Sequence, residues 1–187
     1  IPLPLQEVTL DWQIIGRKAA NQGEATPFKI LLVAVPNEII QQYQAIAAAA
    51  KLELLSLEAE VFGLARALIG EQEEKTAVCL VDIGARSTTV NIIDKGILKI
   101  SHSFDTSGSD LTSVIAQGLN MDYRQAEEAK KKYGLTITTH QAENQIKQAM
   151  LPLVDLILNE IKKIISSFSQ AEGNEGQGIP KIILAGA

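Results

Sequence analysis

The sequence predicts an α/β fold whose sheet mixes antiparallel and parallel strands, and three observations support this. Residues 77–100, AVCLVDIGARSTTVNIIDKGILKI, have the pattern of three consecutive strands joined by short turns. Residues 141–170 then carry apolar side chains at helical spacing, and residues 181–184 return to a strand pattern. A strand meander that is followed by helices and a further strand implies both kinds of strand pairing.

The composition is typical of a globular protein and excludes some classes of function. The chain has 187 residues, of which 46% are apolar and 21% charged. A formal charge of −5 argues against nucleic acid as a partner, because neutralising phosphates requires clustered Lys and Arg. The single cysteine, Cys79, lies in an apolar strand, so we expect a buried structural thiol and no disulfide framework. No apolar run reaches the roughly 20 residues of a transmembrane helix.

The first third of the chain predicts a small αβ module. Apolar and polar residues alternate over residues 8–14, which indicates a half-buried strand, and residues 16–26 are typical of an exposed loop. Residues 29–35 form an apolar strand that Pro36 ends, and Asn37 is expected to cap the helix that follows.

A short third strand is predicted over residues 52–57, and a second helix over residues 58–69. Residues 71–75 are a charged linker. The predicted organisation is therefore a small αβ subdomain at 1–57, a helix and linker at 58–75, and a second lobe at 76–187.

After the meander in the sequence, a polar turn at residues 106–110 leads into an amphipathic helix. Asp122 is expected to cap the next helix and Gly134 to end it. The long helical pattern at 141–170 contains Pro152, which is expected to kink or divide it.

The turn after the first strand of the meander is the first candidate site. Asp82 ends that strand, Gly84 follows, and Ser87 and Thr88 add hydroxyl groups. A glycine lets backbone N–H groups approach a phosphate, hydroxyls add hydrogen bonds, and a strand-end carboxylate can hold a divalent cation. The alternative is an ordinary hairpin turn with a capping aspartate.

Loops at one end of such a sheet gather at a common cleft. The turn after Asp82, the turn at 106–110, the helix carrying Glu127 and Lys130, and the tail at 185–187 are expected to meet there. Glu127 and Lys130 lie three residues apart and equally suit a surface ion pair, with the run of lysines at 130–132 on a solvated face.

Four motifs resemble those of the actin, Hsp70 and sugar-kinase ATPase superfamily. VDIGARSTTVNIID at 81–94 resembles its second phosphate motif, and SGSDLT at 107–112 its GG-x-D-L-T turn. AEEAKKKYG at 126–134 resembles the nucleoside helix, and IILAGA at 182–187 the start of the adenosine motif. The resemblance implies an actin-like, RNase H-like fold that binds ATP with Mg²⁺.

Within that superfamily the chain is most similar to the PilM family of type IV pilus assembly proteins, which is itself FtsA-like. IPLPLQEVTLDWQIIG at 1–16 and the segment from LLVAVPNEII to GLARAL at 31–68 carry this resemblance. The superfamily's N-terminal D-x-G phosphate hairpin is expected before Ile1, and its adenosine motif stops at Ala187. We therefore expect a fragment in which nucleotide is absent or weakly bound.

The resemblance also implies a role for each matched residue. Asp82 would help to hold Mg²⁺, and Gly84, Ser87 and Thr88 would line the β- and γ-phosphate side. The remaining nucleotide-binding residues would be Gly108 and Asp110 at the second turn, Glu127 and Lys130 near the ribose or adenine, and Gly186 at the adenosine loop. No catalytic residue is assigned.

The implied function is that of a nucleotide-binding scaffold in type IV pilus assembly, cytoplasmic and peripheral to the inner membrane. Its partners would be the cytoplasmic N-terminal segment of PilN, docked on the small module, other inner-membrane pilus components, and further copies of itself. It would be at most a slow ATPase. The alternatives are an FtsA-like cell-division filament protein and an active ATPase or kinase of the same superfamily.

Overall fold

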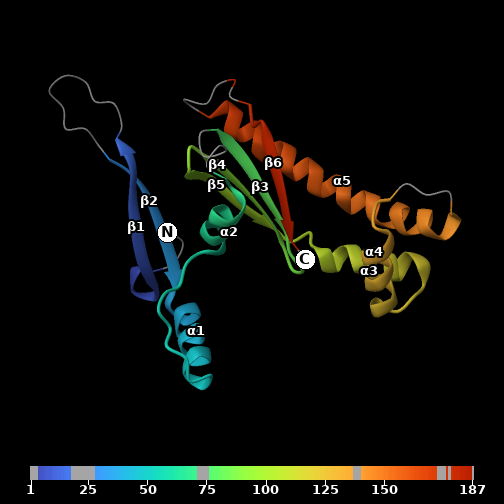
Figure 1. The fold of residues 1–187 in the computed structure, drawn as a ribbon, viewed down its shortest axis with the longest axis horizontal. Coiled ribbons are helices and arrows are strands. Elements are labelled where there is room, and N and C mark those ends of the chain that lie inside the picture. Colours follow the sequence, from blue (N-terminus) through green and yellow to red (C-terminus); the bar gives the residue numbers. More distant parts are fainter. Residues whose placement is uncertain are drawn as a thin grey trace. The chain divides into compact units, whose positions relative to one another are not determined.

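The chain forms two compact units, Ile1–Gly63 and Leu64–Ala187. The structure, a computed structural model, describes residues 4–17, 28–70, 76–136, 140–171, 176 and 178–186. Figure 1 shows the helices and strands of the two units.

The first unit is built on a two-stranded antiparallel ribbon, β1 (Val8–Arg17) with β2 (Phe28–Pro36). A short 3-10 helix, η1 (Leu5–Glu7), precedes the ribbon, and α1 (Asn37–Ala49) follows it. A strand is present over residues 8–14 as predicted, but it is not half-buried, since Leu10, Trp12 and Ile14 are exposed. β1 also continues through a register shift after Ile14, so Gly16 and Arg17 belong to the strand and not to the predicted loop. The rest of that predicted loop, from residue 18, lies outside the described residues.

Asn37 does not cap α1 as predicted, because it is the first residue of the helix and Pro36 occupies the N-cap position. Its side chain instead accepts a hydrogen bond from Thr9 Oγ1 (2.8 Å) and donates one to the carbonyl of Gln6 (3.0 Å). The amide therefore joins the start of α1 to β1 and η1.

The predicted third strand at 52–57 is wrong. This segment has neither helical nor strand structure and leads to α2 (Glu60–Leu68), within the helix predicted at 58–69. An extended segment becomes a strand only by pairing its N–H and C=O groups, and residues 52–57 pair with neither β1 nor β2. The predicted linker at 71–75 lies outside the described residues.

The second unit contains the predicted meander, β3 (Ala77–Ile83), β4 (Thr88–Asp94) and β5 (Ile97–Phe104), paired antiparallel. The last strand, β6 (Lys181–Gly186), lies parallel to β3, so the order is β5-β4-β3-β6 (Figure 1). The prediction of a mixed sheet is confirmed. Between β4 and β5, Lys95 and Gly96 have φ values of 53° and 72°, as a two-residue hairpin turn of this hand requires.

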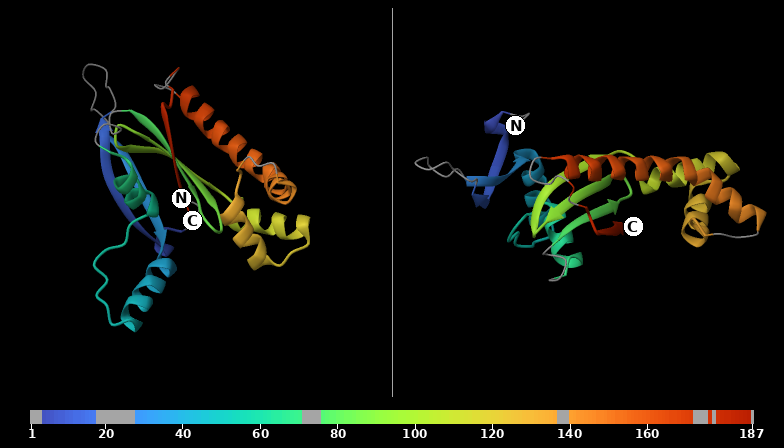
Figure 2. Two further views of the ribbon diagram at one scale, coloured as in Figure 1. Left: turned by 45° about the vertical axis from the view of Figure 1, so that its right-hand side comes forward. Right: turned by 90° about the horizontal axis from the view of Figure 1, so that it is seen from above.

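One face of this sheet is covered by α5 (Gln141–Gln170), which crosses it as a single helix (Figure 2). Pro152 lies inside the helix and does not divide it. The core between helix and sheet consists of Ala77, Cys79, Val81, Val90, Ile92, Ile157, Ile161, Ile164 and Phe168. Cys79 is buried as predicted, and this burial raises the pKa of its thiol to about 11.

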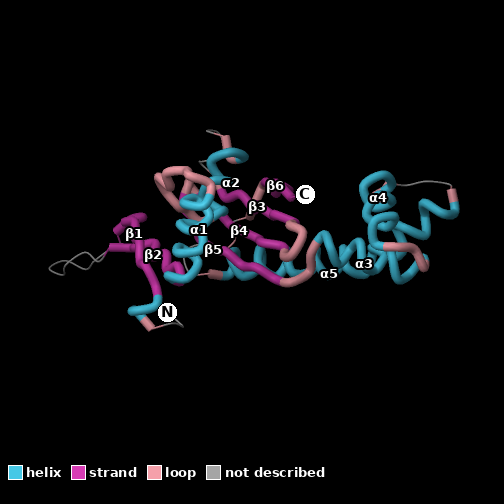
Figure 3. Tube along the Cα trace, turned by 90° about the horizontal axis from the view of Figure 1, so that it is seen from below, coloured by secondary structure: helices cyan, strands magenta, loops and turns pink. Residues whose placement is uncertain are grey.

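A second, smaller core joins α3 (Gly108–Leu119) and α4 (Tyr123–Tyr133) to the first half of α5 (Figure 3). Its buried members are Ile115, Ala126, Ile146 and Met150. The predicted helix ends are present, because Asp122 Oδ1 accepts a hydrogen bond from the Gln125 amide (2.9 Å) and Gly134 follows the last turn with φ 53°. This core holds α3 and α4 next to each other.

Candidate functional site

The turn between β3 and β4 has a row of unused backbone donors. The Gly84 amide donates to the carbonyl of Ser87 (3.0 Å), and a Cβ at Gly84 would lie 3.1 Å from that oxygen, so a glycine suits this close approach. The amides of Ala85, Arg86 and Ser87 make no hydrogen bond within the described part of the chain. Adjacent unpaired N–H groups are donors that an anion such as a phosphate can accept.

The first turn of α3 is hydrogen-bonded to this β3–β4 turn. The Gly108 amide donates to the Gly84 carbonyl (2.9 Å), and the Ser109 amide to the Ala85 carbonyl (3.2 Å). Thr88, which is buried, donates its hydroxyl proton to the Thr106 carbonyl (2.6 Å). The Gly108 amide and the Thr88 hydroxyl proton are therefore committed to joining two segments of this chain.

Asp110 closes a capping box at the start of α3. Its Oδ2 accepts hydrogen bonds from the Ser107 amide (2.9 Å) and the Ser107 hydroxyl (2.6 Å), while Ser107 Oγ accepts from the Asp110 amide (3.4 Å). Asp110 thereby fixes where the helix begins, and so where Gly108 lies.

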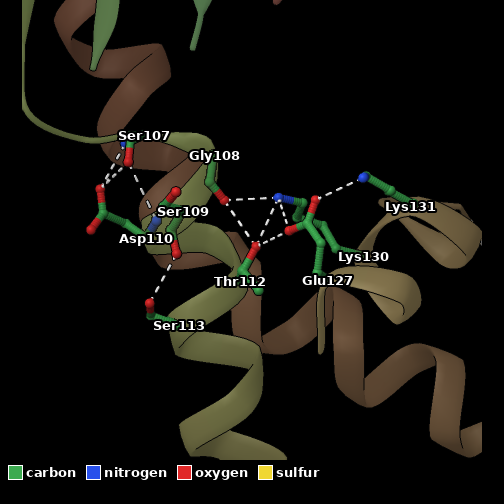
Figure 4. Close-up of polar contacts among 9 residues, drawn as sticks. All are labelled: Ser107, Gly108, Ser109, Asp110, Thr112, Ser113, Glu127, Lys130 and Lys131. Atoms are coloured by element: carbon green, nitrogen blue, oxygen red, sulfur yellow. Dashed lines mark hydrogen bonds and ion pairs between the residues drawn. The ribbon is translucent and has the colours of Figure 1, made fainter. Parts of the chain in front are cut away.

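Lys130 of α4 reaches across to α3 (Figure 4). Its Nζ donates to the Gly108 carbonyl (2.8 Å) and to Thr112 Oγ1 (2.8 Å), and lies 2.7 Å from Glu127 Oε2. An ammonium group has three protons, so these three acceptors satisfy it fully. The prediction of a solvated lysine face is wrong for Lys130, whose side chain is 18% exposed, against 71% for Lys131.

Glu127 is held in its ionised form by these neighbours. The hydrogen bond from Lys130 lowers the pKa of its carboxyl most, that from Thr112 adds to this, and burial opposes both, so that the pKa is about 2. Lys131 lies 3.3 Å from the second oxygen, Oε1. At neutral pH Glu127 can therefore accept hydrogen bonds but has no proton to give.

Thr112 is the residue of this cluster to which the sequence interpretation gave no role. It is fully buried, and its hydroxyl contacts Glu127 Oε2, Lys130 Nζ and, at 3.1 Å, the Gly108 carbonyl. The sequence feature that could have pointed to Thr112 is its position, one helical turn after Gly108 at the end of the SGSDLT motif. That spacing places the two residues on one side of α3.

Gly186 brings the end of β6 to the same edge of the sheet. It pairs with Ile83 at the end of β3 and has φ 134°, a backbone conformation that favours glycine. A Cβ there would lie 2.8 Å from the carbonyl carbon and 3.0 Å from the nitrogen of Ile83. The two strand ends can approach this closely only because residue 186 has no side chain.

Asp82 stands at the same strand end, in register with Thr89 of β4 and Ala185 of β6. Its carboxylate has no hydrogen-bond or ion-pair partner among the described residues. The same part of the chain contains no group of three or more His, Cys, Asp or Glu side chains that could bind a metal. A lone carboxylate fits Mg²⁺, which keeps several of its waters and uses one or two carboxylates.

The structure thus brings the predicted site residues to one edge of the second unit. Hydrogen bonds connect the β3–β4 turn to the first turn of α3, and that turn to Lys130 and Glu127 of α4. Strand pairing brings Gly186 beside Ile83, next to Asp82. The two histidines of the chain lie elsewhere, with His102 on β5, where its ring centroid is 6.3 Å from that of Phe104, and His140 just before α5.

A family profile described as "Type IV pilus assembly protein PilM" matches residues 1–187. Among solved structures, a chain of the "PilM-PilN type IV pilus biogenesis complex" superposes with a TM-score of 0.73 at 20% identity, covering 100% of this chain and 60% of that chain. MreB 5 of Spiroplasma citri bound to AMPPNP superposes with a TM-score of 0.65 at 17% identity, covering 82% and 54%. The predicted actin-like ATPase fold is confirmed.

The cell division protein FtsA of Staphylococcus epidermidis is 40% identical over 62 residues, which are 33% of this chain and 13% of that protein. The chain therefore spans a small part of this curated relative and 60% of the matched chain of the PilM-PilN complex.

Proposed function

The chain belongs to the family of the type IV pilus assembly protein PilM, and on this premise we propose that it is a nucleotide-binding, actin-like scaffold of pilus assembly that docks the cytoplasmic N-terminal segment of PilN. The observation that carries the nucleotide part is the edge of the second unit. There the unpaired amides of the β3–β4 turn, the Asp82 carboxylate and the Glu127–Lys130 pair lie on connected segments.

In this proposal each group of the edge serves one part of ATP. The amides of Ala85, Arg86 and Ser87, with the Ser87 hydroxyl, donate to phosphate oxygens. Asp82 holds Mg²⁺ through its carboxylate or its waters, and the cation offsets the phosphate charge. Gly84, Thr88, Gly108 and Asp110 maintain the backbone of the two turns.

In this proposal, residues of α4 and β6 bind the nucleoside end of the ligand. Glu127, as an anion, accepts hydrogen bonds from sugar hydroxyls through the oxygen that faces Lys131. The aliphatic stem of Lys130 offers apolar cover for a base while its ammonium stays bound to Gly108 and Glu127. Gly186, without a side chain, leaves room beside Ile83 for the adenosine loop.

The partner part of the proposal rests on the first unit. The ribbon of β1 and β2 exposes a ladder of large apolar side chains on one face, formed by Leu10, Trp12, Ile14, Ile30 and Leu32. Each of the two strands also has one edge that no other described strand covers. An extended peptide can add main-chain hydrogen bonds along such an edge and place its side chains on the apolar face.

The setting proposed for this scaffold is the cytoplasmic face of the inner membrane, where other pilus components and further copies of the chain would join it. Among the residues that the structure describes, no helix has the length and apolar character that crossing a bilayer requires. In this proposal, attachment to the membrane comes through partners such as PilN.

Nucleotide binding is tested by titrating the full-length protein with MgATP and measuring phosphate release, in wild type beside Asp82→Ala. We expect binding that weakens at least tenfold in Asp82→Ala, with little phosphate release in either protein. Asp155→Ala, which removes an exposed carboxylate from α5, is the control and should bind as wild type does. Rapid release that depends on Asp82 would favour an ATPase or kinase over a scaffold, and no MgATP binding by wild type would refute the proposal.

Peptide docking is tested with a synthetic N-terminal segment of PilN and two variants of the full-length protein. Trp12→Ala should weaken binding by roughly tenfold, because buried aromatic anchors dominate such interfaces. Tyr43→Ala, at an exposed aromatic residue of α1 in the same unit, should leave binding unchanged. Equal affinity of the peptide after removal of the first unit would refute docking there.

A further inference from the structure

Thr112 occupies the centre of the polar cluster between α3 and α4 (Figure 4). Its hydroxyl is enclosed, with no exposed surface on the residue, and it contacts groups from both helices. Two of these groups, the Glu127 carboxylate and the Lys130 ammonium, are charged. A neutral hydroxyl held between opposite charges has a defined orientation, because it must accept from one and donate to the other.

The donor and acceptor properties of the groups around Thr112 fix the direction of each hydrogen bond. Lys130 Nζ is only a donor, so Thr112 Oγ1 accepts from it at 2.8 Å. The single hydroxyl proton then goes to Glu127 Oε2, a charged acceptor, and not to the Gly108 carbonyl, which already accepts from Lys130 at 2.8 Å. Thr112, Glu127 and Lys130 therefore each contact the other two, and Lys130 also binds the Gly108 carbonyl.

The same helix also joins the cluster to the β3–β4 turn. Gly108, one helical turn before Thr112, donates its amide to Gly84 and gives its carbonyl to Lys130. A change in how Glu127 and Lys130 are held therefore reaches the segment with the unpaired amides through two hydrogen bonds. Thr112 is the buried residue that contacts Lys130 at one end of this path.

We propose that Thr112 is a positioning residue of the nucleotide site, whose hydroxyl fixes the Glu127 carboxylate and the Lys130 ammonium against the first turn of α3. The inference rests on the proposed nucleotide-binding function and deepens it. Thr112 acts through Glu127 and Lys130, which are the groups that meet the ligand. Its hydroxyl, not its shape, is the feature that matters.

The test compares substitutions of Thr112 that separate shape from hydrogen bonding, in the full-length chain. Thr112→Val keeps the branched shape and loses the hydroxyl, whereas Thr112→Ser keeps the hydroxyl and loses the methyl group. Ser113→Ala is the control, because Ser113 lies next on α3 and its hydroxyl donates within its own helix to the Ser109 carbonyl (2.9 Å). Two quantities are measured: the NMR titration of the Glu127 carboxyl carbon, assigned with Glu127→Gln, and the Kd for MgATP.

We expect Thr112→Val to raise the pKa of Glu127, because a donor to its ionised form is lost, and to weaken MgATP binding by roughly tenfold. Thr112→Ser should restore both quantities, and Ser113→Ala should change neither. If Thr112→Val does not fold, Thr112→Ala replaces it, since alanine and serine differ only in the hydroxyl.

The proposal is overturned if the variant without the hydroxyl has the wild-type Glu127 titration and the wild-type Kd. It is also overturned if Thr112→Ser behaves like Thr112→Val, because shape would then be the cause. Failure of the wild-type chain to bind MgATP would refute the proposed function. The Glu127 titration, which needs no nucleotide, would still decide whether Thr112 fixes the pair.

Discussion

The ribbon of the first unit and the sheet of the second unit are both rich in apolar strand residues, yet they differ in what covers them. In β3 the residues from Ala77 to Val81 are all buried. In the ribbon Trp12 is 62% exposed, and the apolar residues beside it are exposed as well. Part of the difference lies in the layers, because α5 packs on the sheet face that carries Ala77, Cys79 and Val81. Nothing described in the first unit covers the ladder around Trp12.

This contrast matches the two tasks proposed for the molecule, partner docking on the first unit and nucleotide binding on the second. A contiguous apolar surface of this kind on a folded unit is typical of an interaction site, so the ribbon is suited to a partner. In the second unit, strand pairing instead holds Asp82, the β3–β4 turn and Gly186 together at one edge of the sheet. Substitutions in the two regions should therefore have opposite consequences for stability and for docking.

The largest expected difference in the free energy of unfolding is between the alanine variants of two aromatic residues. Phe168 is 1% exposed in the core between α5 and the sheet, so Phe168→Ala should lower the free energy of unfolding by about 3–5 kcal/mol. Trp12→Ala in the ribbon should lower it by less than about 1 kcal/mol, since the indole is already in solvent. Denaturant unfolding of the full-length variants measures both. A large loss at Trp12 would mean that the ribbon face is part of a core.

A smaller difference in stability is expected between the alanine variants of two glycines that lie in strands. Gly186→Ala should cost about 2–3 kcal/mol, because the new Cβ would press on the backbone of Ile83 and φ 134° is unfavourable for alanine. Gly16→Ala in β1 should change stability by less than about 0.5 kcal/mol, since its Cβ would meet no atom within 4 Å. Thermal unfolding of both variants makes the comparison, and equal melting temperatures would contradict the close approach of β6 to β3.

The structural features that the sequence predicted correctly are those that neighbouring residues determine. The meander follows from alternation and from the Asp94-Lys95-Gly96 turn, whose positive φ values suit a two-residue hairpin. The helix ends at Asp122 and Gly134 follow from an aspartate side chain that accepts from a nearby amide and from a glycine that adopts positive φ without strain. Such features need only a few consecutive residues, so a sequence is enough to find them.

What the sequence missed depends on distant partners. Residues 52–57 have a strand pattern but no described strand to pair with, and Asn37 bonds to Gln6 and Thr9 instead of capping its helix. The burial of Lys130, in contrast to Lys131, was also missed, because it depends on the packing of α4 against α3. The convergence of the site loops was predictable from the strand order, but the central place of Thr112 was not, because it requires two helices in contact.

The smallest expected effect concerns the pH dependence of the second unit. The carboxyl pKa of Glu127 is about 2 in the folded chain, below its ordinary value of 4.5, so the folded state binds its proton less readily than the unfolded state. Its contribution to stability, about 1 kcal/mol after solvent screening, is complete above pH 4.5 and is lost as the pH falls towards 2. Unfolding free energies between pH 5 and pH 2 should therefore fall more steeply in wild type than in Glu127→Gln. Lys130→Met should flatten the curve in the same way, because it removes the largest cause of the lowered pKa, whereas parallel curves for wild type and both variants would mean that the cluster between α3 and α4 is not formed in solution.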